Sequence, residues 1–589
     1  MRKRILWMLP VAAAAAVGAG VGLAGPGDGS QSLSNVPTPN TKAAGYAPWN
    51  KTSAEIVDVG RAQGSTPLEN PVGITRFYGY QNDVVSPDDP NLPQMVPTNG
   101  LLTGGLCKPA VSPAAQTCAL EAQKTEPDKN TYLVFKNGLP GADAGYDYGR
   151  SFLFQGHEIA ARDAQGRPLG YVTRINLDAD AAHRVTLVAT QEHDGTPMPV
   201  IDGSTWDPFA KRLLFTSEGN GSTTGGVWQV TADSVAPTSN AQNLLAQIGR
   251  GGFEGIQNDS AGDLYIVEDI GGDNKVDPAS TTTPPATTPA RRPNSYVYRF
   301  VPDDPADLTT GGKLQALQVL RSDGTPITFA SQLPLNSPDQ LLIHSGATLD
   351  TKWITVHTGI TPGGFNANLA ARNAGATPFK RPENGVFRPG THFGEFYFDE
   401  TGDTNATSPE NGAAAGWGSI VRLSQLSPKS DTGKLTLFYL AKRETAGFDN
   451  IQFLTRDGLA VVQDMGDTLH TQTKTLDSGF LLDVTADYSS TTPLRWLAEG
   501  RDPSATLDSA NGFAATPTST SSKNDGDNEI TGIHVSDGDP SINGILGAKM
   551  PTPFRAGWRW FWTQQHGDNA TWEVLPANAG LSRDESENR

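Results

Sequence analysis

Short apolar runs, each preceded by a turn and followed by polar residues, recur along this chain. In the clearest example, residues 264–267 read Leu-Tyr-Ile-Val, and this β-branched and aromatic composition favours a buried strand. The preceding residues 259–263 read Asp-Ser-Ala-Gly-Asp, which is typical of a turn. The run leads into Glu268 and Asp269, and Glu254 lies upstream of the same turn. This stretch therefore predicts a strand with acidic side chains at its exit.

The same order of turn, short strand and acidic exit occurs several more times. Acids follow the apolar runs at residues 213–216, 396–398 and 459–462, and runs without an acid occur at 353–356 and 560–563. Units repeated at intervals of roughly 50 residues or more are typical of a β-propeller with long loop insertions, so the sequence predicts an all-β fold of this class. Strand exits in a radial array converge on one mouth of the central channel, where we expect distant acids to meet. The alternative is that these acids are ordinary solvated loop residues.

The composition indicates many turns and argues against nucleic acid as a partner. The chain of 589 residues contains 64 glycines and 43 prolines, and its formal net charge is −18. Such a charge is unfavourable beside a phosphate backbone. It suits hard cations such as Ca²⁺, which prefer oxygen ligands.

The N-terminal segment has the pattern of an export signal. Three basic residues, Arg2 to Arg4, precede an alanine-rich apolar run that ends in small residues, so we expect residues 1–24 to be a signal peptide. A membrane anchor is the alternative. Residues 25–50 read as a flexible linker, 51–577 as the propeller and 578–589 as a disordered tail. The sequence thus predicts an exported monomer, periplasmic, in the cell envelope or extracellular, without a transmembrane domain after cleavage.

Two further features concern loops. Cys107 and Cys118 are the chain's two cysteines, and in an exported protein we expect them to form a disulfide, since a zinc site would need histidines that are not nearby. Residues 276–293 are a low-complexity Thr/Pro/Ala stretch, which predicts an exposed loop. A strand at 296–301 follows at once, so we expect the chain to leave and re-enter the same blade.

One turn offers a cation beside a carboxylate. Pro382 biases the preceding Arg381 toward an extended conformation, so that Arg381 and Glu383 project from one rigid turn. An arginine suits a bidentate grip on phosphate or carboxylate; the alternative is a surface ion pair. His157 and Glu158 could also ligate a metal or act as acid and base, although a structural hydrogen-bonding role is favoured for this pair.

The acids form the set of candidate metal ligands, because calcium takes carboxylate oxygens. The members are Glu218, Glu254, Glu268, Asp269, Glu383, Asp449, Asp464 and Glu529. Glu529 ends the acidic cluster 525–529, for which a flexible loop is the alternative.

Several short motifs follow one another in a recognisable order. They are Gly203-Ser-Thr-Trp206 leading to Phe215-Thr-Ser-Glu218, Phe253-Glu-Gly255, Tyr265-Ile-Val-Glu-Asp269, Tyr296-Val-Tyr-Arg-Phe-Val301, Arg381-Pro-Glu383, Phe448-Asp-Asn450, Asn528-Glu-Ile-Thr-Gly532 and Gln564-Gln-His566. Their order resembles that of the PhoX-type alkaline phosphatases over most of residues 70–570.

The resemblance implies a six-bladed propeller, export, calcium dependence and an iron–calcium centre that hydrolyses phosphomonoesters. By the same resemblance, Arg381 holds the substrate phosphate, and Glu254 and Glu383 bridge or bind metal; these three are the predicted catalytic residues. Ser217 stands where the family has an iron-binding cysteine. Because a serine hydroxyl is a poor iron ligand, calcium is expected and the iron is in doubt.

The leading hypothesis is therefore a secreted, metal-dependent hydrolase of small phosphate esters. Two alternatives stay open at this point. One is a non-enzymatic, calcium-stabilised propeller that binds a partner. The other is a lactonase- or phytase-like hydrolase, since propellers host several chemistries.

Overall fold

The computed structural model describes residues 67–69, 75–81, 96–97 and most of 127–576, with gaps at 159–160, 163–167, 180–182, 184, 220–223, 237, 331–336, 474–476, 500–528, 554 and 566–569. The signal peptide, the linker, the tail and the pair Cys107 and Cys118 lie outside the described residues and stay predictions. Among the helices of the described part, none has the length and apolar character needed to span a bilayer.

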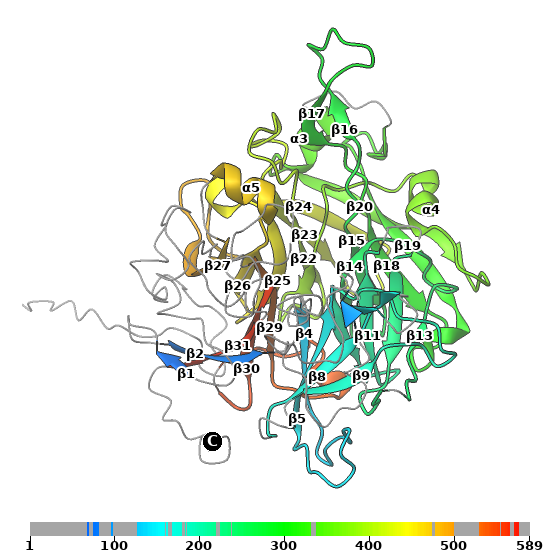
Figure 1. The fold of residues 1–589 in the computed structure, drawn as a ribbon. Helices are drawn as coiled ribbons and strands as arrows, with labels where there is room; N and C mark the ends of the chain where they lie inside the picture. Colours follow the sequence, from blue (N-terminus) through cyan, green and yellow to red (C-terminus); the bar gives the residue numbers. More distant parts are fainter. Residues whose placement is uncertain are drawn as a thin grey trace, which may run out of the picture.

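Antiparallel sheets make up most of the fold (Figure 1). Two four-stranded sheets come first: β4 (Pro127–Val134), β5 (Ser151–His157), β8 (Val172–Asn176) and β9 (Val185–Ala189); then β10 (Ser204–Asp207), β11 (Arg212–Ser217), β12 (Gly226–Val230) and β13 (Gln242–Asn243). The next sheet has nine strands: β14 (Phe253–Asn258), β15 (Leu264–Glu268), β18 (Val297–Pro302), β19 (Gly312–Val319), β20 (Thr348–Thr358), β24 (Thr432–Leu440), β23 (Ser419–Gln425), β22 (Glu395–Glu400) and β21 (Gly385–Phe387).

Two more sheets complete the array. One consists of β25 (Phe448–Phe453), β26 (Gly458–Gln463), β27 (Asp477–Asp483) and β28 (Leu494–Glu499). The other consists of β29 (Glu529–Ser536), β30 (Arg559–Gln565), β31 (Ala570–Pro576), β2 (Thr75–Gln81) and β1 (Pro67–Glu69). Because β2 pairs along its length with β31, strands from both ends of the chain share this sheet.

The remaining elements are short strands and helices outside these sheets. They are β3 (Val96–Pro97), β6 (Ala161–Arg162), β7 (Pro168–Leu169), β16 (Asn274–Val276), β17 (Thr287–Arg291), the α-helices α3 (Pro338–Ile343), α4 (Ala367–Ala374) and α5 (Gly466–Thr473), and the 3₁₀ turns Leu308–Thr310, Arg443–Thr445 and Ile542–Gly544.

One strand from each repeating unit lies on a closed ring. The strands contact one another in the order β4, β10, β14, β21, β25 and β29, and β29 contacts β4 again. The all-β propeller class predicted from the sequence is confirmed. The number of six blades stays a prediction, since β20 pairs with β24 and joins two neighbouring units into one sheet.

Alternation along the strands supplies the core between neighbouring sheets. Leu213 and Phe215 of β11 pack into one hydrophobic cluster, whereas Leu214 packs into the next. A sheet that is covered on both faces needs apolar residues at every position, which is why these strands appear in the sequence as continuous apolar runs. Burying one such side chain stabilises the fold by about 1.5–3 kcal/mol.

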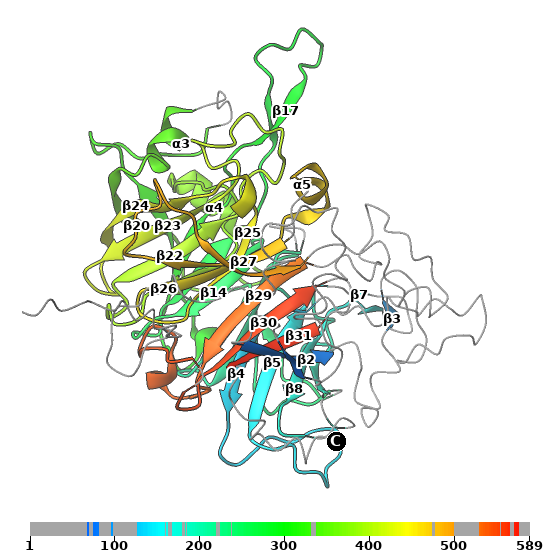
Figure 2. The same ribbon diagram turned by 90° about the vertical axis from the view of Figure 1, so that its left-hand side faces the viewer.

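The low-complexity insertion differs in part from its prediction. Residues 287–291 form β17, which pairs with β16 in a two-stranded hairpin that projects from the body (Figure 2). The prediction of a loop is wrong there, because Ala290 is buried and the Arg291 N–H donates to Asp403 Oδ1 (3.0 Å), which anchors the hairpin base. The predicted return to the same blade is confirmed, since β15 pairs directly with β18.

The turn between β14 and β15 buries an acid away from the ring centre. Asp259 Oδ1 accepts the backbone N–H groups of Ala261 (2.7 Å) and Asp263 (3.0 Å), while its buried Oδ2 has no partner among the described residues. Burial, followed by the charge of Asp263, raises the pKa of Asp259 to about 7. Folding therefore favours the protonated acid, and this contribution to stability is lost as the pH rises through about 7.

We expect Asp259→Asn to raise the free energy of unfolding at pH 8 by about 2 kcal/mol, because the substitution removes the buried charge and keeps the acceptor oxygen. The advantage should shrink toward pH 5, where the wild-type acid is protonated. Thermal unfolding across pH 5–8 measures it. Asp304→Asn is the control, since exposed Asp304 accepts a similar turn hydrogen bond from Ala306 (2.9 Å). Parallel stability curves for wild type and Asp259→Asn would contradict the prediction.

Candidate functional site

Acidic side chains from several blades meet in one cavity of about 250 Å³. Among the predicted site residues, those that line it are Glu218, Glu254, Asp269, Arg381, Glu383, Asp449 and Asp464. They come from positions in or next to β11, β14, β15, β21, β25 and β26, so the ring brings together acids that the sequence separates by up to about 250 positions. We call this space the carboxylate cavity.

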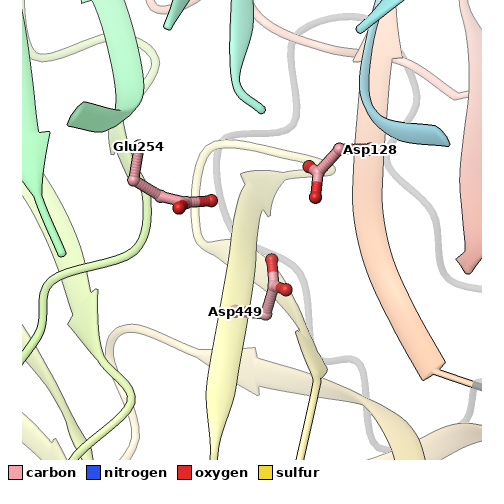
Figure 3. A group of neighbouring side chains, drawn as sticks. All are labelled: Asp128, Glu254 and Asp449. Carbon is pink, nitrogen blue, oxygen red and sulfur yellow. The ribbon is translucent and has the colours of Figure 1, made fainter. Parts of the chain in front are cut away.

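The carboxylates are close enough to share cations. Glu254, Asp128 and Asp449 lie around one point (Figure 3), with one ligand oxygen of each within 4.8 Å of the others. Three more groups satisfy the same limit: Asp128, Glu158 and Asp202; Asp202, Glu218 and Glu254; and Glu218, Asp269 and Glu383. Because the groups share members, they form one continuous carboxylate cluster.

This cluster carries more acid than its surroundings can neutralise. Burial first, and then the neighbouring charges of Asp202 and Glu383, raise the pKa of Glu254 well above its ordinary value. The pKa values of Asp128 and Asp449 are raised in the same way, again chiefly by burial. A group of buried carboxylates with raised pKa values gains free energy when a cation replaces the protons.

Arg381 is the one cationic side chain in the described lining of this cavity. Its Nε donates to both oxygens of Asp269 (2.8 and 3.0 Å), and its Nη2 donates to Asp269 Oδ2 (2.5 Å) and lies 3.5 Å from Glu383 Oε1. Burial alone would lower the pKa of Arg381, but the charges of Asp269 and Glu383 raise it. The guanidinium is therefore held in place and permanently charged.

The backbone of Arg381 corrects the prediction of an extended conformation. Its φ is +58°, in the left-handed region that side-chain-bearing residues seldom adopt. Tertiary hydrogen bonds hold this geometry: Thr401 N–H donates to the Arg381 carbonyl (2.9 Å), and Gly402 N–H donates to the Lys380 carbonyl (3.3 Å). The Lys380 ammonium is itself fixed between Asp403 (2.9 Å) and Glu410 (2.5 Å). Such contacts outweigh a backbone cost of about 1 kcal/mol.

Glu383 is positioned by close backbone packing. Gly255 N–H on β14 donates to the Glu383 carbonyl (2.8 Å), and Asn384 N–H donates to Asp399 Oδ1 (2.8 Å). A Cβ on Gly255 would come within 2.8 Å of Asn384 Cα, so only glycine allows this approach. The Phe-Glu-Gly motif and the Arg-Pro-Glu motif are therefore packed directly against each other.

One predicted metal ligand lies outside the described lining of the cavity, and for another only the backbone is described. Glu268 accepts hydrogen bonds from the Tyr298 hydroxyl (3.0 Å), the Tyr296 N–H (3.1 Å) and Asn368 Nδ2 (3.0 Å), and it does not line the cavity. All three bonds reach Oε2, while the buried Oε1 has no hydrogen-bond partner among the described residues, so the assignment of Glu268 as a metal ligand stays a prediction. Glu529 begins β29 opposite Gln565, which is all that the described backbone shows of it.

The serine at the expected cysteine position is also outside the cavity. Ser217 ends β11 and is fully buried, and its hydroxyl has no hydrogen-bond partner among the described residues. The described lining of the carboxylate cavity offers neither thiolate nor imidazole. Apart from the thioether of Met465, its possible ligand atoms are oxygens, the set that suits hard cations such as Ca²⁺.

Three acids of the cluster were not among the predicted ligands. Asp128 is the second residue of β4, at the start of a strand, and the apolar residues 198–201 before Asp202 include a proline, so the strand-exit pattern marked neither acid. Glu158 was considered only as a partner of His157. His157 instead stacks on Tyr171 (4.4 Å) and hydrogen-bonds Thr173 (2.6 Å), whereas Glu158 lines the cavity and accepts from Gln565 Nε2 (2.6 Å).

One family model matches part of this chain. Residues 287–539 match the family model described as alkaline phosphatase PhoX. The match includes Arg381, Glu383, Asp449 and Asp464, and it confirms the resemblance over that segment. No curated protein matches the sequence significantly.

Solved structures give only distant likenesses. A periplasmic gluconolactonase of Pseudomonas aeruginosa is 11% identical, with a TM-score of 0.30 over 76% of this chain and 86% of that one. An auxiliary nutrient binding protein of Bacteroides thetaiotaomicron is 9% identical, with a TM-score of 0.32 over 88% and 96%. Likenesses at this level carry no argument about function.

Proposed function

We propose, from the match of residues 287–539 to the PhoX alkaline phosphatases, that this chain is an exported, metal-dependent hydrolase of phosphomonoesters. The observation that carries the proposal is the carboxylate cavity, in which a buried arginine lies beside a cluster of acids. This combination provides a cation for phosphate oxygens next to oxygen ligands for divalent metal.

The metal proposed for the cluster is calcium, held by Glu218, Glu254, Glu383 and Asp449 together with Asp128, Asp202 and Asp269. When bound, such ions polarise phosphoryl oxygens and neutralise developing negative charge. Asp464 also lines the cavity, and burial followed by the charge of Asp477 raises its pKa to about 7.

Arg381 has one nitrogen left for a substrate. Nε and Nη2 are engaged by Asp269 and Glu383, while Nη1 has no hydrogen bond within the described residues. We assign Nη1 to a phosphate oxygen, with Asp269 fixing the plane of the guanidinium. A cation held before the reaction begins stabilises developing charge without reorganisation, which is the main source of catalysis in phosphoryl transfer.

The proposal is tested with pure protein at alkaline pH on a chromogenic phosphomonoester, with Ca²⁺ and with excess chelator. We expect hydrolysis that requires Ca²⁺. A parallel panel of a phosphodiester, phytate and a lactone separates the phosphatase from the other hydrolases. If chelator lowers the melting temperature and no ester is cleaved in any metal, the protein is the non-enzymatic, calcium-stabilised propeller.

A further inference from the structure

We propose that a second cavity, next to the carboxylate cavity, binds the leaving group of the ester and selects leaving groups that carry an anionic group of their own. The inference rests on the proposed function. This leaving-group cavity has a volume of about 480 Å³ and shares Glu218 and Asp269 with the carboxylate cavity. A phosphate held at Arg381 would therefore have its organic group directed toward a space large enough for a small metabolite.

The rest of the lining is mostly polar and includes residues of helix α4. Asn368 and Arg372 are four residues apart and lie on one face of α4, with Leu369 beside them. Asn294 and Ile270 line the cavity from the segments around β15 and β18. Amides, a guanidinium and two aliphatic side chains together suit a short carbon skeleton with hydroxyl and anionic substituents.

Arg372 is the one cationic side chain in the described lining of this cavity. Its Nη2 donates to Asn294 Oδ1, its guanidinium lies 3.9 Å from the centre of the Phe329 ring, and its buried Nε has no hydrogen-bond partner among the described residues. No ion pair to Arg372 occurs within the described residues. Four other arginines differ in this respect, since Arg321, Arg381, Arg388 and Arg559 each pair with a carboxylate.

A guanidinium that stacks on an aromatic ring and has no carboxylate partner among the described residues is suited to binding an anionic group of a ligand. The anion could be a carboxylate or a second phosphate, because both accept two parallel N–H bonds from arginine. Arg372 lines this cavity and not the carboxylate cavity, so it would offset the repulsion of the anionic group by the two shared acids, Glu218 and Asp269. The substrate class is therefore a small phosphomonoester with a second acidic group.

Two ester pairs test this selectivity in calcium-loaded protein. Glycerol 3-phosphate and 3-phosphoglycerate differ by a carboxylate, while fructose 6-phosphate and fructose 1,6-bisphosphate differ by a phosphate. We expect wild-type kcat/KM to favour the acidic member of at least one pair by about tenfold, the value of roughly 1.4 kcal/mol for one charged contact. The pair that shows the preference identifies the anion.

The preference should depend on Arg372. Arg372→Gln should lower the ratio of kcat/KM for the acidic ester to kcat/KM for its partner by about tenfold, mainly through KM. Arg372→Lys should retain part of the preference, because lysine keeps the positive charge but cannot donate two parallel hydrogen bonds. Arg321→Gln is the control, since Arg321 lines neither cavity. Melting temperatures verify that each variant is folded. A wild type without preference, or a ratio unchanged in Arg372→Gln, would overturn the inference.

Equilibrium binding of the same esters separates this inference from the proposed function. If esters are hydrolysed without an Arg372-dependent preference, the leaving-group inference fails and the phosphatase stands. If no ester is hydrolysed but binding still favours the acidic ester in wild type and not in Arg372→Gln, the phosphatase fails and the anion site stands. If neither kcat/KM nor equilibrium binding favours the acidic ester, the anion site is overturned, whether or not esters are hydrolysed.

Discussion

Arg381→Ala should lower kcat/KM for a phosphomonoester by about 10²- to 10³-fold, the usual loss when a preorganised charge-stabilising donor is removed. The reason is that the guanidinium is the one cation in the described lining of the carboxylate cavity, and Asp269 holds it rigidly. Arg381→Lys should recover only a small part of the activity, since a lysine cannot bind Asp269 in bidentate fashion and reach a phosphate at once.

Steady-state kinetics of the two variants on one chromogenic ester measure the effect. Arg388→Ala is the matched control, because Arg388 pairs with Glu395 (2.9 Å) and lines neither cavity. Its effect should appear in thermal stability and not in kcat. Hydrolysis by Arg381→Ala at the wild-type rate would refute the role assigned to this residue.

Metal removal should abolish hydrolysis and lower the melting temperature by about 5 °C, because a ligand present at one hundred times its Kd stabilises the fold by about 2.7 kcal/mol. In chelator, the buried acids regain their raised pKa values, so the stability of the metal-free protein should fall as the pH rises. The sign follows because each such acid is protonated more readily in the folded state than in the unfolded state.

Glu254→Gln separates the metal effect from general damage. It should weaken the stabilisation by Ca²⁺ and, in chelator at pH 8, make the protein more stable than wild type, since it removes one buried charge from a crowded cluster. Differential scanning calorimetry with Ca²⁺ and with chelator measures the stabilisation by Ca²⁺ and the stability of the metal-free protein. Glu444→Gln, at an exposed position, should change neither. A Glu254→Gln variant with the full wild-type response to Ca²⁺ would exclude Glu254 as a ligand.

A buried lysine, Lys129, contacts the residue that follows the Arg-Pro-Glu turn. Lys129 follows Asp128 on β4, and its Nζ donates to Asn384 Oδ1 (2.5 Å). Burial lowers the pKa of Lys129 to about 8. The lysine is thus engaged one residue away from the Arg-Pro-Glu turn, which leaves Arg381 as the cation that faces the cavity.

The sequence by itself determined the local elements of this protein. The apolar runs at 213–216, 264–267 and 459–462 lie in β11, β15 and β26, because residues that are buried on both faces of a strand leave a continuous apolar signature. The turn at 259–263 followed from its composition, and Gly262 has the positive φ (+86°) that such turns require. The acids at strand exits could also be predicted, because they follow these apolar runs in the sequence.

Only the tertiary structure decided which acids form the site. Asp128 and Asp449 lie in one group of ligands although 321 positions separate them, because closure of the ring places β4 and β25 on either side of β29. Glu268 and Asp269 are adjacent in sequence, yet one is bound by Tyr298 and Asn368 and the other by Arg381. The left-handed backbone of Arg381 likewise depends on hydrogen bonds from residues 401 and 402. Local propensity fixes where a strand begins and ends, whereas contacts between blades fix the direction in which each acid points.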